Sequence, residues 1–223
     1  MGCGMNSLKA VVFDMDGLMF DTERLGVEAW SNVGQKLGLN ITKELMLKVI
    51  GVSWVSNKKI FTQELGEFDF YNAQALFHEY LNDAIVNNDI PVKPGLMDLL
   101  DFLDEVKLKK AVATSSNYDD AMFFLTKAGV YNRFDAIVTG DMIANGKPNP
   151  DIFLHTAGLL GVSPEECMVL EDSINGIKAA HSAGMKPVMI PDLIPPNEEI
   201  RPLLYAKLTS LADVILLIED MEK

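Results

Sequence analysis

Two aspartates separated by one residue are the first feature of this 223-residue chain that could do chemistry. Asp14 and Asp16 follow residues 8–13, a short apolar run of the kind that forms a buried β-strand. Side chains at positions i and i+2 of an extended chain point to the same side, so both carboxylates can face one site. Gly17 then permits a sharp turn. Taken alone, the pattern is equally typical of an ordinary turn.

Polar residues also follow the other apolar runs, at 110–114, 135–139, 167–170 and 186–190. Ligands of open parallel sheets bind beyond the carboxyl ends of the strands, so the residues at these ends are the candidates for a site. They are Asp14, Asp16, Thr114, Ser115, Ser116, Asn117, Gly140, Asp141, Glu171 and Asp172, joined by Lys147 from the turn at 146–148.

A cation is needed if so many carboxylates are to lie together, because they otherwise repel one another. Hard oxygen ligands with little nitrogen or sulfur favour Mg²⁺, which we therefore predict as the cofactor. His78, His155 and His181 lie inside helical patterns and away from this edge. Since histidines that bind a metal normally cluster, we expect these three to be structural or solvated.

The elements that must position these residues alternate between strand and helix. Helical periods lie between the apolar runs, at 95–106, 119–128, 150–160 and 173–183. This order predicts an α/β fold with a Rossmann-like parallel sheet. From residue 21 to about 88 only helical periods occur, which is too long and too structured for a crossover. We therefore predict a helical domain at 21–89, inserted after the first strand of an α/β core formed by 1–20 and 90–223.

Composition limits the possible partners. The net charge is −13, with 19 basic against 32 acidic residues, which argues against a nucleic-acid partner. No stretch approaches the roughly 18 apolar residues of a membrane span, and Cys3 and Cys167 suggest neither a disulfide framework nor a zinc site. The first residues do not resemble a signal peptide, so we expect a cytoplasmic protein, either a monomer or a weak homodimer.

Four segments together resemble the motifs of the haloacid-dehalogenase-like hydrolases. They are FDMDG at 13–17, ATSS at 113–116, GKPNP at 146–150 and LEDS at 170–173 with Gly176. The resemblance covers about residues 8–190 and implies that family's fold, with the helical insertion as a cap of the first type. It is strongest to the branch that holds β-phosphoglucomutase and many sugar-phosphate and nucleotide-like phosphatases.

The resemblance implies a Mg²⁺-dependent phosphatase that acts through an aspartyl-phosphate. Asp14 would be the nucleophile, and Asp16 would be the general acid and then the general base. Thr114 and Lys147 would complete the catalytic set by holding the phosphate. The metal would be bound by Asp14, the main-chain carbonyl of Asp16 and Asp172, with Glu171 as a further ligand or a neighbour that balances charge. The substrate would be a small phosphorylated metabolite, contacted by Ser115, Ser116, Asn117, Glu23 and Trp54.

Two alternatives to hydrolysis stay open. A mutase of the β-phosphoglucomutase type must bind a second phosphate, which calls for cations in the cap. The histidine, lysine and arginine of that enzyme's cap are replaced here by Gly26, Ile50 and Trp54, so hydrolysis is favoured. A catalytically silent metabolite-binding module is the second alternative, and Asp16 argues against it. Trp54 could stack on a substrate ring or simply pack, and Glu23 is also a normal residue for a helix start.

Overall fold

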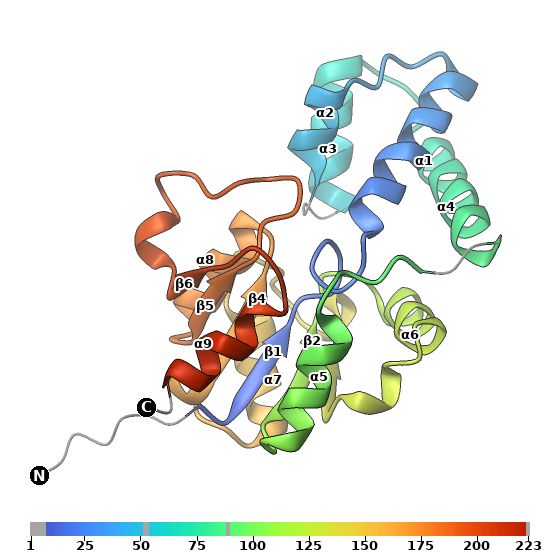
Figure 1. Ribbon diagram of the computed structural model, residues 1–223. Coiled ribbons are helices and arrows are strands. Elements are labelled where there is room, and N and C mark those ends of the chain that lie inside the picture. Colours follow the sequence, from blue (N-terminus) through green and yellow to red (C-terminus); the bar gives the residue numbers. More distant parts are fainter. Residues whose placement is uncertain (1–7, 51–53, 88–89, 222–223) are drawn as a thin grey trace, which may run out of the picture. The chain divides into compact units, whose positions relative to one another are not determined.

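The computed structural model describes residues 8–50, 54–87 and 90–221. The chain forms two compact units (Figure 1). One consists of Met1–Phe20 and Val92–Lys223, and the other of Asp21–Pro91. We call them the α/β unit and the helical unit.

A parallel sheet organises the α/β unit. Within the described residues it has six strands in the order β3-β2-β1-β4-β5-β6. The strands are β1 (Ala10–Phe13), β2 (Lys109–Ala113), β3 (Ala136–Val138), β4 (Cys167–Glu171), β5 (Lys186–Met189) and β6 (Ala206–Lys207). The predicted α/β class and the five predicted strands are confirmed. Strand β6 was not predicted, because a strand of two residues carries no periodicity to detect.

Helices cover both faces of this sheet. They are α5 (Leu96–Glu105), α6 (Tyr118–Lys127), α7 (Asp151–Leu160), α8 (Ile174–Ser182) and α9 (Asp213–Met221), with short 3₁₀ turns at Tyr131–Arg133, Gly140–Met142, Pro164–Glu166 and Arg201–Leu203. Figure 1 shows α5 and α9 in front of the sheet and α7 behind it. Because both faces are covered, all four residues of β1 are buried, as expected for a central parallel strand.

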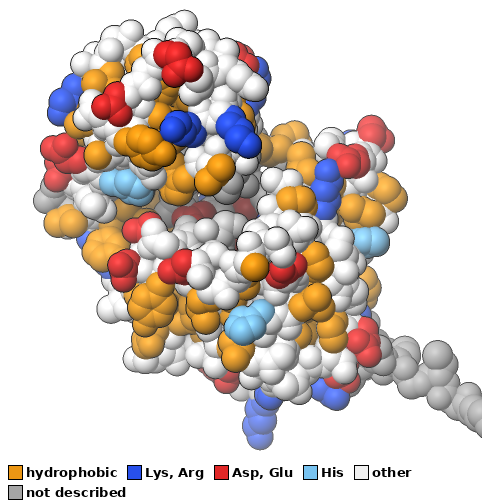
Figure 2. Space-filling model, turned by 180° about the vertical axis from the view of Figure 1, so that it is seen from behind, with side chains coloured by type: hydrophobic (Ala, Val, Ile, Leu, Met, Phe, Trp, Pro, Cys, Tyr) orange, Lys and Arg blue, Asp and Glu red, His pale blue; other side chains and the backbone are white. Residues whose placement is uncertain are grey.

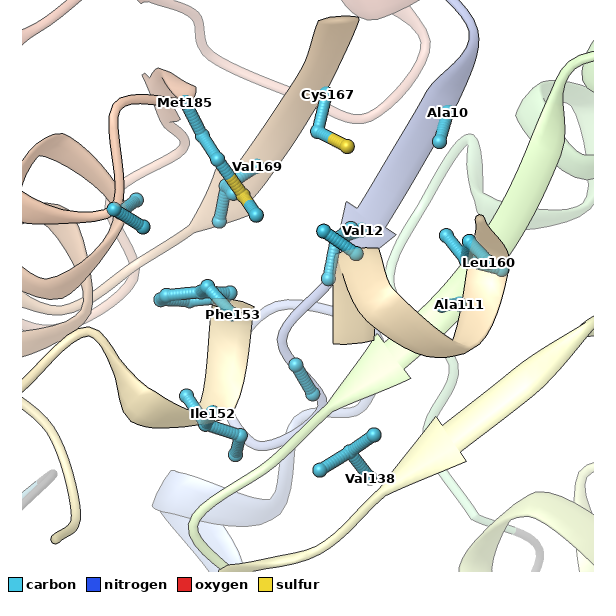
Figure 3. Close-up of a cluster of buried hydrophobic side chains, with 14 of the residues drawn as sticks. Ala10, Val12, Ala111, Val138, Ile152, Phe153, Leu160, Cys167, Val169 and Met185 are labelled. Atoms are coloured by element: carbon cyan, nitrogen blue, oxygen red, sulfur yellow. The ribbon is translucent and has the colours of Figure 1, made fainter. Parts of the chain in front are cut away.

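A hydrophobic cluster lies between the sheet and the helices α7 and α8 (Figure 3). Val12 and Val169 contribute from neighbouring strands, and Phe153 and Met185 pack against them. Cys167 belongs to the same cluster, where burial raises the pKa of its thiol to about 11. This thiol therefore has the surroundings of a core residue.

The helical unit contains α1 (Thr22–Leu37), α2 (Lys43–Val49), α3 (Trp54–Leu65) and α4 (Phe70–Asn87). Its core is aromatic, with the Trp30 ring centroid 4.4 Å from that of Phe61 and 5.0 Å from that of Phe77. Helix α1 is followed by the C-cap residue Gly38, whose φ of 67° is in the left-handed region that glycine favours. Thr42 begins α2 by accepting a hydrogen bond from the backbone of Leu45.

The surface carries charges of both signs. Figure 2 shows basic and acidic side chains interspersed with apolar ones on the face that it draws. Ion pairs at the surface, such as the exposed pair Lys48–Glu64 and the partly exposed pair Lys178–Glu199, contribute at most about 1 kcal/mol each. Across the described parts of the chain, no helix combines the length and the hydropathy needed to cross a bilayer.

Candidate active site

The register of three central strands brings the predicted site residues to one edge. Phe13 of β1 lies level with Val112 of β2 and Leu170 of β4. The residues that come next, Asp14, Ala113–Thr114 and Glu171–Asp172, therefore emerge together at the carboxyl end of the sheet. The backbone holds them there, since Asp14 N donates to Leu170 O at 3.0 Å and Thr114 N donates to Val138 O at 3.0 Å.

Lys147 ties these strand ends together. Its ammonium donates to Asp14 Oδ1 at 2.5 Å, to Glu171 Oε1 at 2.7 Å and to the Ala113 carbonyl at 3.0 Å. The side chain is only 5% exposed, and its Nζ lies 5.1 Å from the centroid of the Phe153 ring. One buried cation thus connects the ends of β1, β2 and β4. A lysine in a solvent-exposed turn would not make these contacts.

Glu171 is fixed by donors on both of its oxygens. While Oε1 accepts from Lys147, Oε2 accepts from the backbone N of Ser173 at 3.0 Å and from its hydroxyl at 2.8 Å. The Ser173 hydroxyl also accepts from Gly176 N, which makes it the N-cap of α8. Ser173 was predicted only as part of the motif at 170–173, with no role of its own. The available signal was its position before a helix and two residues after an acid.

Gly176 gives the Glu171 carboxylate its space. A Cβ atom at this position would overlap the carboxylate group itself. The start of α8 can therefore approach the end of β4 only because this residue has no side chain. The sequence marked Gly176 as part of a motif, and the structure supplies the reason.

The Asp14 carboxylate is costly to keep charged in this site. Burial raises the pKa of Asp14 to about 8; Lys147 opposes this rise and Glu171 adds to it. For Lys147, burial alone would lower the pKa, but the charges of Asp14 and Glu171 outweigh it and raise the pKa above its ordinary value. The Lys147 ammonium therefore does not outweigh the cost of burying the Asp14 carboxylate.

These acids suit a divalent cation. Asp14, Glu171 and Asp172 each offer a carboxylate oxygen, and the three oxygens lie within 4.8 Å of one another. All three residues are buried. Mg²⁺ prefers oxygen ligands at about 2.0–2.1 Å, and oxygens around one such ion must lie a few ångströms apart. The donor set and the cost of burying the Asp14 carboxylate both fit the predicted metal.

Asp16 is held by hydroxyl groups from the end of β2. Ser116 Oγ donates to Asp16 Oδ2 at 2.7 Å, and Thr114 Oγ1 lies 3.4 Å from the same oxygen. The Thr114 hydroxyl also accepts from Ser116 N at 3.0 Å. These two hydroxyls were predicted to contact phosphate or substrate. In this structure the Ser116 hydroxyl donates to Asp16.

Two other predicted polar residues make structural contacts at this edge. Asn117 is the N-cap of α6, since its side chain accepts from Asp120 N at 2.9 Å. Asp141 accepts from the Thr139 hydroxyl at 2.5 Å, which lowers the pKa of Asp141. Ser115 is exposed, and its carbonyl lies so close to Gly140 that a side chain at Gly140 would overlap it.

Glu23 and Trp54 belong to the helical unit. Glu23 lies in the first turn of α1, where an acid suits the helix dipole. Trp54 begins α3 and packs its ring 5.4 Å from Phe77 and 5.2 Å from His78. These neighbours give Trp54 the contacts of an ordinary packing tryptophan.

The fold and the acidic edge define a class of protein that the comparisons identify. A family model described as haloacid dehalogenase-like hydrolase matches residues 11–190, and the chain belongs to this family. The resemblance predicted from the four motifs is thereby confirmed.

Three individual proteins are similar to most of this chain. The phosphorylated carbohydrates phosphatase of Thermotoga maritima is 34% identical over 180 residues, which cover 80% of this chain and 83% of that protein. The beta-phosphoglucomutase of Bacillus subtilis is 33% identical over 185 residues, covering 80% of this chain and 81% of that protein. The crystal structure of CbbY from Rhodobacter sphaeroides in complex with phosphate aligns with a TM-score of 0.78 at 26% identity, over 93% of this chain and 96% of that one.

Proposed function

We propose that this chain is a Mg²⁺-dependent phosphatase of small phosphorylated metabolites, such as a sugar phosphate or a nucleotide-like monophosphate. The observation that carries the proposal is the buried contact of 2.5 Å between Lys147 and Asp14, set among further acids at the end of β1. A carboxylate beside a fixed cation can meet a phosphate dianion without prohibitive repulsion. The relatives named phosphatase and phosphoglucomutase support phosphoryl chemistry at such a site.

Asp14 is the proposed nucleophile. Its carboxylate attacks phosphorus, the bond to the leaving oxygen breaks, and an aspartyl-phosphate remains. Asp16 gives its proton to the leaving oxygen. It then takes a proton from the water that attacks phosphorus, and the bond from phosphorus to Asp14 breaks to release phosphate. Thr114 and Lys147 hold the phosphoryl oxygens in both steps.

Asp14, Asp172 and the main-chain carbonyl of Asp16 are the proposed metal ligands. Mg²⁺ bound there would offset the repulsion between the acids and the phosphate. We assign Glu171 mainly to Lys147, because both of its oxygens already accept protein hydrogen bonds. Its buried charge keeps the ammonium in place beside Asp14.

The helical unit is proposed to act as the cap that selects the substrate. Glu23 and Trp54 are its candidate substrate contacts, as are Ser115 and Asn117 in the α/β unit. We also propose that the protein is cytoplasmic, that it is a monomer or a weak homodimer, and that it has no nucleic-acid or membrane partner.

A phosphosugar mutase is the second candidate, favoured by the identity of 33% to the beta-phosphoglucomutase of Bacillus subtilis. Gly26, Ile50 and Trp54 supply no cation for a second phosphate, so we expect no conversion of β-glucose 1-phosphate to glucose 6-phosphate. A coupled dehydrogenase assay measures this directly. Efficient turnover there would establish the mutase in place of the phosphatase.

The primary test is release of phosphate from p-nitrophenyl phosphate and from a panel of sugar phosphates and nucleoside monophosphates. We expect release with Mg²⁺, none with excess EDTA, and none from an Asp14→Asn variant. The variant also separates an enzyme from a silent binding module, whose ligand binding would survive the change. No release from any member of the panel with Mg²⁺ present would refute the phosphatase.

A further inference from the structure

We infer that Ser116 is a positioning residue, whose hydroxyl fixes the carboxyl group of Asp16 for proton transfer to the leaving group. Ser116 was predicted to be one of the direct substrate contacts. The present inference rests on the proposed function, in which Asp16 is the general acid, and it gives Ser116 a different task from Thr114 and Lys147.

The geometry around Asp16 Oδ2 separates the two neighbouring hydroxyls. Ser116 Oγ lies 2.7 Å from this oxygen, a normal length for a strong hydrogen bond to a carboxylate. Thr114 Oγ1 lies 3.4 Å away, at the outer limit of such a bond. A hydroxyl has one proton to donate, so Ser116 cannot give the same proton to a phosphate oxygen while it holds Asp16.

The loop that carries Ser116 is itself fixed by the backbone. Ser116 N donates to the Thr114 hydroxyl at 3.0 Å, and its carbonyl accepts from Gly140 N at 2.8 Å. Thr114 is buried and begins where β2 ends. Contacts to β2 and to the segment after β3 therefore set the position of the Ser116 hydroxyl before any substrate binds.

The backbone of Asp16 lies outside the six-stranded sheet, whereas that of Asp14 is hydrogen-bonded to it. Asp14 follows directly on β1 and its backbone N remains in the sheet, donating to Leu170 O. Asp16 lies beyond the strand at a turn where Gly17 N donates to Phe20 O at 2.9 Å. A general acid contributes fully only when its proton is aimed at the leaving oxygen, and an error of about 1 Å can cost on the order of 100-fold in rate. The bond from Ser116 restricts the rotation of this carboxyl group.

A pair of aryl phosphates distinguishes a residue that acts through Asp16 from one that binds phosphate. p-Nitrophenolate leaves readily without a proton, whereas phenolate benefits strongly from one. The two substrates, p-nitrophenyl phosphate and phenyl phosphate, present the same phosphate and a similar ring. Loss of a phosphate contact lowers kcat/KM for both alike, while loss of acid positioning lowers it selectively for phenyl phosphate.

We therefore expect Ser116→Ala to lower kcat/KM for phenyl phosphate by roughly 10–100-fold and for p-nitrophenyl phosphate by less than about 3-fold. Ser116→Thr, which keeps a hydroxyl, should restore much of the loss. In an Asp16→Asn background, Ser116→Ala should cost little further for either substrate. Ser182→Ala, which removes an exposed hydroxyl at the end of α8, is the matched control and should behave as the parent.

Equal losses for the two substrates would overturn the inference and return Ser116 to the phosphate site, and no loss for either would overturn it as well. A parent chain that releases phosphate from neither substrate in Mg²⁺ refutes the proposed function instead, so the two failures are distinct. If Ser116→Ala does not fold, judged by thermal unfolding, Ser116→Gly removes the same hydroxyl and is held to the same selectivity.

Discussion

The carboxyl edge of the sheet and the core of the helical unit are built on opposite principles. At the sheet edge, buried charges fix one another, as Lys147 does with Asp14 and Glu171. In the helical unit, the side chains are held by the packing of uncharged aromatic rings around Trp30. A buried ion pair is costly to break because one partner is left as an uncompensated charge. An aromatic core is instead destabilised when a substitution removes side-chain volume and leaves a cavity. Substitutions at the sheet edge should therefore lower activity most, and substitutions in the helical unit should mainly change stability or substrate choice.

Lys147→Ala should have the largest effect. It leaves Asp14 and Glu171 buried without their cation, so we expect activity to fall on the order of 1000-fold and the free energy of unfolding to fall by about 3–5 kcal/mol. Steady-state kinetics on p-nitrophenyl phosphate and urea denaturation measure the two effects.

Lys58→Ala is the matched control in the helical unit, where the lysine lies 4.3 Å from the centre of the Tyr71 ring. It should cost at most about 1 kcal/mol of stability and little activity. Equal losses of activity for the two lysines would mean that the phosphate site has been misplaced.

Gly176→Ala should rank second. The new Cβ must displace the Glu171 carboxylate, and through it Lys147. We expect a loss of kcat of about 10–100-fold and a destabilisation of about 1–3 kcal/mol. Gly158→Ala in α7 is the control, because a Cβ there would have no described heavy atom within 4 Å apart from its chain neighbours and the backbone of its own helix. It should be neutral or stabilise by up to about 1 kcal/mol. A fully active Gly176→Ala variant would contradict the proposed role of Glu171.

Mg²⁺ should stabilise the chain more at high pH than at low pH. The pKa of Asp14 is raised to about 8 in the folded chain from its ordinary 3.8. Folding therefore favours the protonated carboxyl, and this contribution to stability is present at low pH and is lost as pH rises towards 8. Metal binding needs the carboxylate, so its affinity rises over the same range.

Thermal unfolding with Mg²⁺ or EDTA at pH 5.5, 7.0 and 8.5 tests this dependence. At a fixed Mg²⁺ concentration, set to 100 times the dissociation constant measured at pH 8.5, Mg²⁺ should raise the Tm by about 5–10 °C at pH 8.5 and by clearly less at pH 5.5. The difference should shrink in Asp14→Asn. A shift of the same size at all three pH values would contradict this assignment of Asp14.

Trp54→Phe should have the smallest effect on catalysis. The smaller ring keeps part of the packing against Phe77 and His78, so we expect a loss of about 1–2 kcal/mol in stability. If Trp54 also contacts the substrate, KM rises for a sugar phosphate and kcat for p-nitrophenyl phosphate stays near the parent value. A large fall in kcat would instead place Trp54 with the residues of the sheet edge.

The sheet edge could be predicted from sequence because strand ends dictate it. Apolar runs locate β1, β2 and β4, and parallel register then places Asp14, Thr114 and Glu171 side by side. Lys147 lies in a turn, to which no rule of strand register applies, and its role of holding the phosphate was implied by the resemblance to a family. The space at Gly176 and the contact from Ser116 to Asp16 depend on how side chains approach in three dimensions, which no periodicity encodes.

The helical unit yielded less to the same reasoning. Its four helices follow from their helical periods, but the sequence left open whether Trp54 stacks on a substrate ring or packs in the core, and only its neighbours Phe77 and His78 show the packing.

In the α/β unit, helix α9 and strand β6 were not predicted. β6 is only two residues long, and it gains its hydrogen bonds from β5 rather than from any pattern of its own.

The most direct test of the account is capture of the phosphoryl group on the chain. The enzyme is mixed with ³²P-labelled substrate and Mg²⁺, quenched in acid within the first turnover, and digested to locate the label. We predict a phosphoryl label that hydroxylamine removes, carried by the peptide that contains Asp14 and absent from Asp14→Asn. Turnover with the label on another residue, or turnover that survives in Asp14→Asn, would contradict the central claim.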